Sequence, residues 1–415
     1  MPHGPSLGTP LVPPLVTDAD IRAARDLLAG VVRPTPLEYS RALSERVGQE
    51  VWLKCENLQR AGSFKIRGAY TRMARLSEEE KARGVVAASA GNHAQGVALA
   101  AQLLGIAAKV YMPLGAPLPK LQATRAYGAT VEQTGLTVDD CLVAARAWAD
   151  ETGAVLIHPF DHPDIVAGQG TCGLEILEQC PDVRTVVVSA GGGGLLAGIA
   201  AAVKAERPDV KVVGVQAEMA AAYPASLAGG RPIPLEKMAT MADGIAVGRP
   251  GDVPFALVRD LVDGIEVVSE AALSRALLFL LERAKLVVEP AGAAAVARLL
   301  EPGGQAVEGP VVAVLSGGNI DPLLLLRIIR YGMVAAGRYL SFAVQVPDRP
   351  GTLARLLADL AETDANVVEV RHGRSEAELF LDEVEIAVEL ETKGPQHREL
   401  VLRTLAERGY RPHVR

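Results

Sequence analysis

One lysine of this chain stands among residues that would favour covalent chemistry on its amine. Lys65 belongs to the segment Ser-Phe-Lys-Ile-Arg-Gly-Ala at 63–69, in which Phe64, Ile66 and Ala69 are expected to be buried. Burial removes water from the charged amine, which lowers its pKa and leaves a neutral amine able to form a Schiff base or accept a proton. A surface lysine at a helix start is the alternative, and this segment alone does not exclude it.

A second segment has the composition of an anion-binding loop. Residues 89–96 read Ser-Ala-Gly-Asn-His-Ala-Gln-Gly and follow an apolar run that resembles a strand. Small residues between a strand and a helix leave backbone N–H groups free for an anion, and an amino-acid carboxylate would suit them. The candidate substrate-binding residues are Ser89, Ala90, Gly91, Asn92 and His93. An ordinary turn capped by Ser89 or Asn92 fits equally well, and His93 alone suits a helix start better than catalysis.

Two further segments stand at expected strand ends. Four glycines at 191–194, followed by Leu195, would let the backbone wrap a phosphate at a helix N-terminus. Ser316, in Ser-Gly-Gly-Asn, offers a hydroxyl that could reach a heterocyclic nitrogen. A flexible turn and a turn-forming serine are the alternatives. An amine, a carboxylate loop, a phosphate loop and a hydroxyl are together what pyridoxal phosphate requires of a protein.

The elements that must position these residues alternate between strands and helices. Short Val, Ile and Ala runs are expected as strands at 85–88, 108–112, 185–189, 212–216 and 311–315. Segments of helical period are expected at 92–104, 120–127 and 195–205. Continuously apolar strands between helices predict an α/β fold with a parallel sheet covered on both faces, where ligands gather at the carboxyl ends of the strands.

The last part of the chain has a different pattern. Residues 340–415 alternate as strand, helix, two strands, helix and a short terminal strand. The order βαββαβ predicts a small α+β domain with both helices on one face of the sheet. We therefore expect a boundary near residues 335–340.

The composition of the chain argues against some classes of binding partner. The 415 residues carry a net charge of −7, which argues against nucleic acid and anionic membranes as partners. The four cysteines match no zinc or disulfide framework, so we expect buried free thiols in a reducing compartment. Residues 1–17 are expected to form a flexible tail and not a signal peptide. Residues 271–288 are expected to form one core helix and not a membrane span. A cytoplasmic protein is expected.

The catalytic segments together resemble the fold-type II pyridoxal-phosphate enzymes, and within them the threonine and serine dehydratases. The resemblance covers residues 18–335. Its markers are Ser-Phe-Lys at 63–65, the octapeptide at 89–96, the glycines at 191–194, Glu-Pro-Ala-Gly-Ala at 289–293 and Ser-Gly-Gly-Asn at 316–319. The family implies two parallel-sheet lobes, as in the tryptophan synthase β chain, with a smaller lobe at about 87–164 inserted in the larger one.

The resemblance also implies roles for the candidates. Lys65 is the catalytic residue and holds pyridoxal 5'-phosphate as a Schiff base, while Phe64 packs beside the ring. Asn92 hydrogen-bonds the ring hydroxyl, Gly191, Gly192, Gly193, Gly194 and Leu195 bind the phosphate, and Ser316 meets the pyridine nitrogen. A serine at that position leaves the nitrogen largely unprotonated, which favours elimination over transamination.

The implied reaction is the removal of water and ammonia from an amino acid. Lys65, once displaced by the substrate amine, takes the α-proton, and the β-hydroxyl leaves with a proton from the cofactor phosphate. Threonine then gives 2-oxobutanoate, as in isoleucine biosynthesis, and serine gives pyruvate. Alternatives are another enzyme of this fold, such as a β-replacement synthase, a hydroxyaspartate dehydratase or a racemase, and a non-catalytic amino-acid sensor.

Two positions depart from related families. Serine racemases of this fold place a serine near the position of Ala90, and an alanine cannot donate the second proton that racemisation needs. A divalent-metal site of related enzymes uses an acidic pair, of which only Glu218 has a counterpart here, because Tyr223 and Pro224 occupy the later region. We therefore assign no metal ligand.

Residues 341–415 resemble an ACT domain, from the loop Asp-Arg-Pro-Gly-Thr-Leu at 348–353 onward. Such domains commonly pair and bind an amino acid where the loop of one meets its neighbour. The resemblance implies feedback by isoleucine or valine through Asp348, Gly351 and Asn366, or a domain kept for assembly alone. A homodimer or homotetramer is expected; the resemblance leaves the effector and the preference between threonine and serine open.

Overall fold

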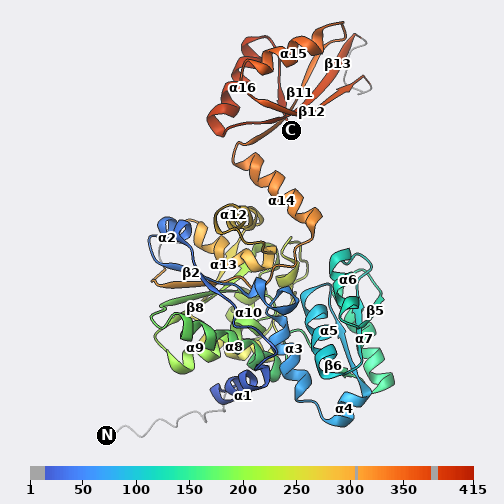
Figure 1. Cartoon of the computed structure of the whole chain (residues 1–415), viewed down its shortest axis with the longest axis vertical. Coiled ribbons are helices and arrows are strands. Elements are labelled where there is room, and N and C mark those ends of the chain that lie inside the picture. The colour runs from blue at the N-terminus through green and yellow to red at the C-terminus, as the bar shows by residue number, and fades with distance from the viewer. Residues whose placement is uncertain (1–14, 304–306, 375–381) are drawn as a thin grey trace, which may run out of the picture. The chain divides into compact units, whose positions relative to one another are not determined.

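The computed structural model describes residues 15–303, 307–374 and 382–415. Most of the expected tail, residues 1–14, lies outside the described residues. The chain divides into two compact units, Met1–Asp321 and Pro322–Arg415. In Figure 1 the colour of the described residues runs from blue through green and yellow to red along the chain.

The larger unit contains a six-stranded sheet in the order β1-β2-β10-β7-β8-β9. Every neighbouring pair is parallel except β1 and β2. Its strands are β1 (Leu37–Tyr39), β2 (Val51–Lys54), β7 (Thr185–Ser189), β8 (Lys211–Ala217), β9 (Gly264–Val268) and β10 (Val311–Val314). All residues of the central strands β7 and β10 are buried, as a sheet covered on both faces requires. The expected parallel α/β architecture is confirmed.

A second, smaller sheet has four parallel strands in the order β5-β4-β3-β6. These strands are β3 (Val85–Ala88), β4 (Ala108–Met112), β5 (Thr130–Gln133) and β6 (Val155–Leu156). Its helices are α5 (Asn92–Leu104), α6 (Leu118–Ala126) and α7 (Val138–Thr152). We refer to residues 85–156 as the small lobe and to the rest of this unit as the large lobe.

The large lobe supplies the remaining helices of the unit. They are α1 (Asp18–Leu28), α2 (Arg41–Val47), α3 (Lys65–Ala74), α4 (Glu78–Arg83), α8 (Pro163–Gln179), α9 (Gly194–Glu206), α10 (Ala222–Gly229), α11 (Asp252–Leu261), α12 (Glu270–Phe279) and α13 (Pro290–Leu300). Short 3-10 turns are η1 (Glu56–Leu58), η2 (Arg60–Gly62), η3 (Glu218–Ala220) and η4 (Asp243–Ile245). Helices α8 and α9 share a hydrophobic core with Val186 and Val188 of β7, and α13 contacts β7 to β10.

One expected helix is shorter than the sequence suggested. Residues 271–288 do not form a single helix: α12 ends at Phe279, a π-helical turn covers Leu280–Ala284, and Lys285 has a left-handed φ of 60°. A residue in that conformation ends a helix, and the alternation of apolar and charged residues could not reveal it. Within the described residues, no helix combines the length and apolar character needed to span a membrane. All four cysteines are buried and free, as expected.

The C-terminal unit is an antiparallel sheet with two helices. Its strands, β11 (Tyr339–Pro347), β12 (Asn366–Gly373), β13 (Glu383–Glu391) and β14 (His413–Val414), lie in the order β12-β13-β11-β14. Helices α15 (Thr352–Ala361) and α16 (Pro395–Glu407) bury Leu356, Leu360, Val401 and Leu405 against the sheet. The βαββαβ order is confirmed.

Helix α14 (Pro322–Ala335) falls in this C-terminal unit. The sequence had placed the boundary after it, near residues 335–340. The division instead comes before α14 because this helix contacts β11, the first strand of the C-terminal sheet.

Candidate active site

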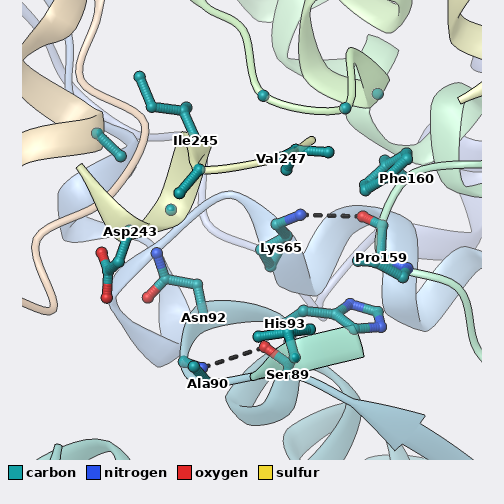
Figure 2. A pocket seen from close by; sticks show the side chains of 18 of the residues that line it. Lys65, Ser89, Ala90, Asn92, His93, Pro159, Phe160, Asp243, Ile245 and Val247 are labelled. Carbon is teal, nitrogen blue, oxygen red and sulfur yellow. Dashed lines mark hydrogen bonds between the residues drawn. The ribbon is translucent and has the colours of Figure 1, made fainter. Parts of the chain in front are cut away.

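All candidate residues of the larger unit line one cavity of about 350 Å³. This volume is within the range of small-molecule sites. The cavity lies where β3, β7 and β10 end, so the carboxyl ends of strands from both sheets meet there. Figure 2 shows side chains that line it. The candidates that line it are Phe64, Lys65, Ser89, Ala90, Gly91, Asn92, His93, Gly191, Gly192, Gly193, Gly194, Leu195 and Ser316.

Lys65 is the first residue of α3, and its side chain points into the cavity. Its Nζ donates a hydrogen bond of 2.9 Å to the carbonyl of Pro159, as Figure 2 shows. Burial lowers the pKa of Lys65 to about 8, against the opposing effect of the Glu289 carboxylate. The neutral amine needed for nucleophilic attack or proton removal is therefore more abundant near neutral pH than in an exposed lysine.

A buried ionic cluster fixes the helix that carries Lys65. Arg67, two residues further along α3, donates two hydrogen bonds of 2.8 Å to Glu56 and forms an ion pair of 2.7 Å with Glu175. Lys54 pairs with the other oxygen of Glu175 at 2.5 Å. The side chains of Arg67, Glu56 and Lys54 have no solvent exposure. Such a cluster holds the start of α3 in one geometry, because a buried charge without its partner would lower the stability of the fold.

The four glycines form a cradle, and at two of them there is no room for a side chain. They join the end of β7 to the start of α9, so the helix N-terminus faces the cavity. A Cβ on Gly192 would lie 2.5 Å from the ring of Phe160, and one on Gly193 would collide with the hydroxyl of Tyr223. Gly193 also has a φ of 100°, in the left-handed region. Backbone N–H groups at such a turn suit an anion such as phosphate.

The segment 89–93 forms the turn between β3 and α5. The Ser89 hydroxyl accepts a hydrogen bond of 3.1 Å from the backbone N–H of Gly91. The Asn92 side-chain oxygen accepts one of 2.9 Å from Asn319. His93 is turned away from solvent and its Nε2 lies 2.8 Å from the Ile157 carbonyl. Burial lowers the pKa of His93 to about 3, so its ring is uncharged and packs as part of the helix start.

Ser316 follows β10 at the floor of the cavity. It is 3% exposed, and its Oγ accepts a hydrogen bond of 3.1 Å from Ser189. The backbone carbonyl of Ser316 also accepts a hydrogen bond of 3.2 Å from Phe64, the residue before Lys65. The lysine and the serine hydroxyl, which are far apart in the sequence, are thus tied to one another through the main chain.

Four charged residues in the cavity were not among the sequence candidates: Lys120, Asp139, Asp243 and Glu289. Glu289 is 1% exposed, and burial raises its pKa to about 7 although Lys120 opposes the shift. Glu289 opened one of the family markers and could have been a candidate on that ground. Lys120 and Asp243 had no such signal, because only the fold brings α6 and η4 together.

The candidate effector residues of the C-terminal unit do not come together within one chain. Gly351 precedes α15 with a φ of 89°, and Asp348 forms hydrogen bonds of 2.8 and 3.1 Å with Arg374. Asn366, however, pairs with Glu391 at one end of β13, whereas Pro347, next to Asp348, pairs with Glu383 at the other. Glu383 and Glu391 are eight residues apart on β13, which corresponds to roughly 27 Å along the strand. Asn366 and Asp348 of one chain therefore lie at opposite ends of the sheet.

The residues in the cavity fit pyridoxal phosphate. A partly buried amine of lowered pKa, a glycine cradle without room for side chains and a buried serine hydroxyl are the groups that its aldehyde, phosphate and ring nitrogen require. Among the described residues no group of three or more His, Cys, Asp or Glu could hold a metal ion.

Comparison with known families agrees with this site. Residues 28–317 match the family model for pyridoxal-phosphate dependent enzymes, and residues 341–409 match the ACT domain. The chain belongs to the family of pyridoxal-phosphate dependent enzymes, with pyridoxal phosphate as its cofactor and an ACT domain in its C-terminal unit.

Individual relatives show which members of the family this chain resembles. The chain is 50% identical to the L-threonine ammonia-lyase of Thermotoga maritima over 401 residues, which cover 96% of this chain and all of that protein. The structure of the processed form of threonine deaminase isoform 2 from Solanum lycopersicum is 38% identical, with a TM-score of 0.71 over 76% of this chain and 94% of that one. Maize serine racemase is 35% identical, with a TM-score of 0.73 over 77% and 99%.

Proposed function

We propose that this protein is a threonine ammonia-lyase that converts L-threonine to 2-oxobutanoate and ammonia and accepts L-serine to give pyruvate. The observation that carries the proposal is the cavity in which Lys65 lies between the glycine cradle and the turn at 89–93. The Thermotoga relative supports the choice of substrate because the similarity extends over its whole length, the second domain included.

Each group in the cavity has a role in this reaction. Lys65 holds the cofactor, the cradle at 191–194 with Leu195 binds its phosphate, and Phe64 packs beside its ring. Asn92 binds the ring hydroxyl and Ser316 the ring nitrogen. The turn at 89–93 receives the substrate carboxylate on its backbone N–H groups.

The chemistry is an α,β-elimination. When bound, pyridoxal phosphate withdraws electrons from the substrate α-carbon and so makes the α-proton removable. Lys65 accepts that proton, for which its lowered pKa suits it. The β-hydroxyl then leaves as water, and the released enamine takes up water and loses ammonia to give the keto acid.

Racemisation is the second candidate, since a serine racemase is among the structural relatives. It requires a proton donor on the face of the substrate opposite Lys65. Ala90, which lines the cavity, has no hydroxyl to donate. The site therefore favours elimination over racemisation.

The ACT domain is proposed to bind isoleucine or valine as a feedback effector, in keeping with a place in isoleucine biosynthesis. Asp348 and Gly351 lie at the loop between β11 and α15. Because Asn366 lies at the far end of the sheet, its contribution must come from a second copy of the domain. The proposed effector site therefore requires a homo-oligomer.

Keto-acid formation tests the function directly. The purified protein, loaded with pyridoxal phosphate, is given L-threonine or L-serine, with and without isoleucine or valine. We expect 2-oxobutanoate from threonine and a rate that changes with the effector. A protein that holds the cofactor and forms no keto acid from either amino acid would contradict the proposal.

A further inference from the structure

A lysine and an aspartate join the two lobes beside the cavity. Lys120 lies on α6 of the small lobe and Asp243 on η4 of the large lobe. The Lys120 Nζ lies 2.6 Å from the Asp243 carboxylate. The lysine side chain is 7% exposed and the aspartate side chain 43%. Figure 2 shows Asp243 on the same side of the cavity as Asn92.

Lys120 also lies against the turn at 89–93. A Cβ built on Gly91 would be 3.0 Å from the Lys120 Cδ and 3.1 Å from its Nζ. The ammonium group is therefore next to the backbone of the turn that is proposed to receive the substrate carboxylate. Lysine has three N–H donors, and Asp243 takes one of them.

The rest of the cavity would repel a carboxylate. Asp139, Asp243 and Glu289 line it together with Lys120. Glu289 adds negative charge to the extent that it is ionised, and burial raises its pKa to about 7. An amino acid enters with its own carboxylate, which needs a positive charge to offset these acids.

Few groups can supply that charge. His93 and His158 line the cavity, but burial lowers their pKa values to about 3 and about 4, so both rings are neutral. Lys65 is engaged by the cofactor. Among the described residues that line the cavity, Lys120 is then the one remaining cation, and Asp243 and Glu289 hold its pKa above the ordinary value although burial opposes them.

We infer that Lys120 recognises the α-carboxylate of the amino-acid substrate, with Asp243 holding its ammonium group over Gly91. The inference rests on the proposed function, to which it adds the residue that makes the site selective for a free carboxylate. The Lys120–Asp243 pair also joins the small lobe to the large lobe beside the substrate position.

The test compares L-threonine with L-threoninamide, which lacks the negative charge. Both are titrated into the cofactor-loaded protein, and dissociation constants are taken from the change in cofactor absorbance. Wild-type protein should bind threonine more tightly than the amide. Lys120→Met should raise the dissociation constant for threonine by about ten- to a hundredfold and leave that for threoninamide within about twofold. Lys120→Arg, which keeps the charge, should retain the preference.

Lys109→Met is the matched control. Lys109 lies on β4 of the same lobe, pairs with Glu132 at 2.9 Å and stacks on Trp148, outside the cavity. Its removal should leave both constants unchanged. If Lys120→Met does not retain the cofactor, Lys120→Gln carries the same prediction.

Equal weakening of both compounds in the Lys120 variants would overturn the inference, because it would indicate a structural role alone. No weakening of either would overturn it as well. A wild-type protein whose cofactor absorbance responds to neither compound would instead overturn the proposed function, and this inference with it.

Discussion

Asn92 and Glu289 lie 197 residues apart in the chain, and the amide of Asn92 donates a hydrogen bond to the buried carboxyl of Glu289. Asn92 is the first residue of α5 in the small lobe, and Glu289 immediately precedes α13 in the large lobe. The second carboxyl oxygen of Glu289 has no hydrogen-bond partner in the described structure. The two lobes thus meet at a carboxyl whose charge changes near neutral pH.

Glu289→Gln should remove a pH dependence of stability. Burial raises the pKa of Glu289 from 4.5 to about 7, so the folded state binds its proton more tightly than the unfolded state. The stabilisation is therefore complete below about pH 4.5 and is lost as the pH rises through about 7. Glutamine has the same shape and stays neutral. The melting temperature of the variant, relative to wild type, should rise by several degrees between pH 5 and pH 8. A constant difference across that range would contradict the assigned pKa.

Lys65→Ala should abolish both cofactor attachment and turnover. Without the amine, the protein loses the group that holds the cofactor aldehyde and the base that takes the α-proton. We expect loss of the visible absorbance of the bound cofactor and a fall in keto-acid formation of at least about a thousandfold. Lys81→Ala, on the exposed helix α4, should leave both unchanged. Continued threonine-dependent keto-acid formation would show that another group is the base.

Gly193→Ala should weaken cofactor binding more than it weakens the fold. The new methyl would meet the Tyr223 hydroxyl and Pro254, so the cradle must open. Gly230→Ala is the matched control: Gly230 also has a positive φ, of 67°, but has no atom within 4 Å of an added Cβ. Both variants carry about 1–2 kcal/mol of backbone strain, measurable by urea unfolding, and Gly193→Ala adds the cost of displacing the buried Tyr223 side chain. Only Gly193→Ala should lose affinity for pyridoxal phosphate. Equal cofactor affinity in the two variants would rule out the glycine cradle as the phosphate-binding site.

Arg67→Met should destabilise the larger unit strongly. Removal of the guanidinium leaves Glu56 buried without its partner, and Arg67 is what lowers the pKa of Glu56 against the effect of burial. We expect a loss of about 3–5 kcal/mol in the free energy of unfolding, as for other buried ion pairs with one member removed. Arg25→Met, which breaks an exposed pair with Glu178, should change little. Similar losses in both variants would contradict a special role for the buried cluster.

Asp348→Ala should abolish the response to isoleucine or valine and leave the basal rate intact. The carboxylate belongs to the proposed effector loop and forms an ion pair with Arg374. Glu399→Ala, on the exposed side of α16, is the control and should keep the response. The rate of keto-acid formation is measured over a range of effector concentrations. An unchanged response in Asp348→Ala would place the effector elsewhere.

The sequence by itself determined the parts of this protein whose chemistry is local. The glycines at 191–194 allow their own backbone geometry, and the apolar residues around Lys65 correctly predicted a buried amine of lowered pKa. Strand and helix periods were sufficient for the parallel α/β fold and the βαββαβ domain, because each period reflects which side of an element is buried.

Only the tertiary structure determined which charged side chains lie close together. Lys120, Asp243 and Glu289 come from three distant segments, and no local pattern marks Lys120 or Asp243. The structure likewise separates Asn366, at the start of β12, from Asp348, which follows β11, because the registers of these two strands against β13 place them at opposite ends of the sheet. The energy of a buried charge depends on the groups packed around it, and those groups are known only once the chain has folded.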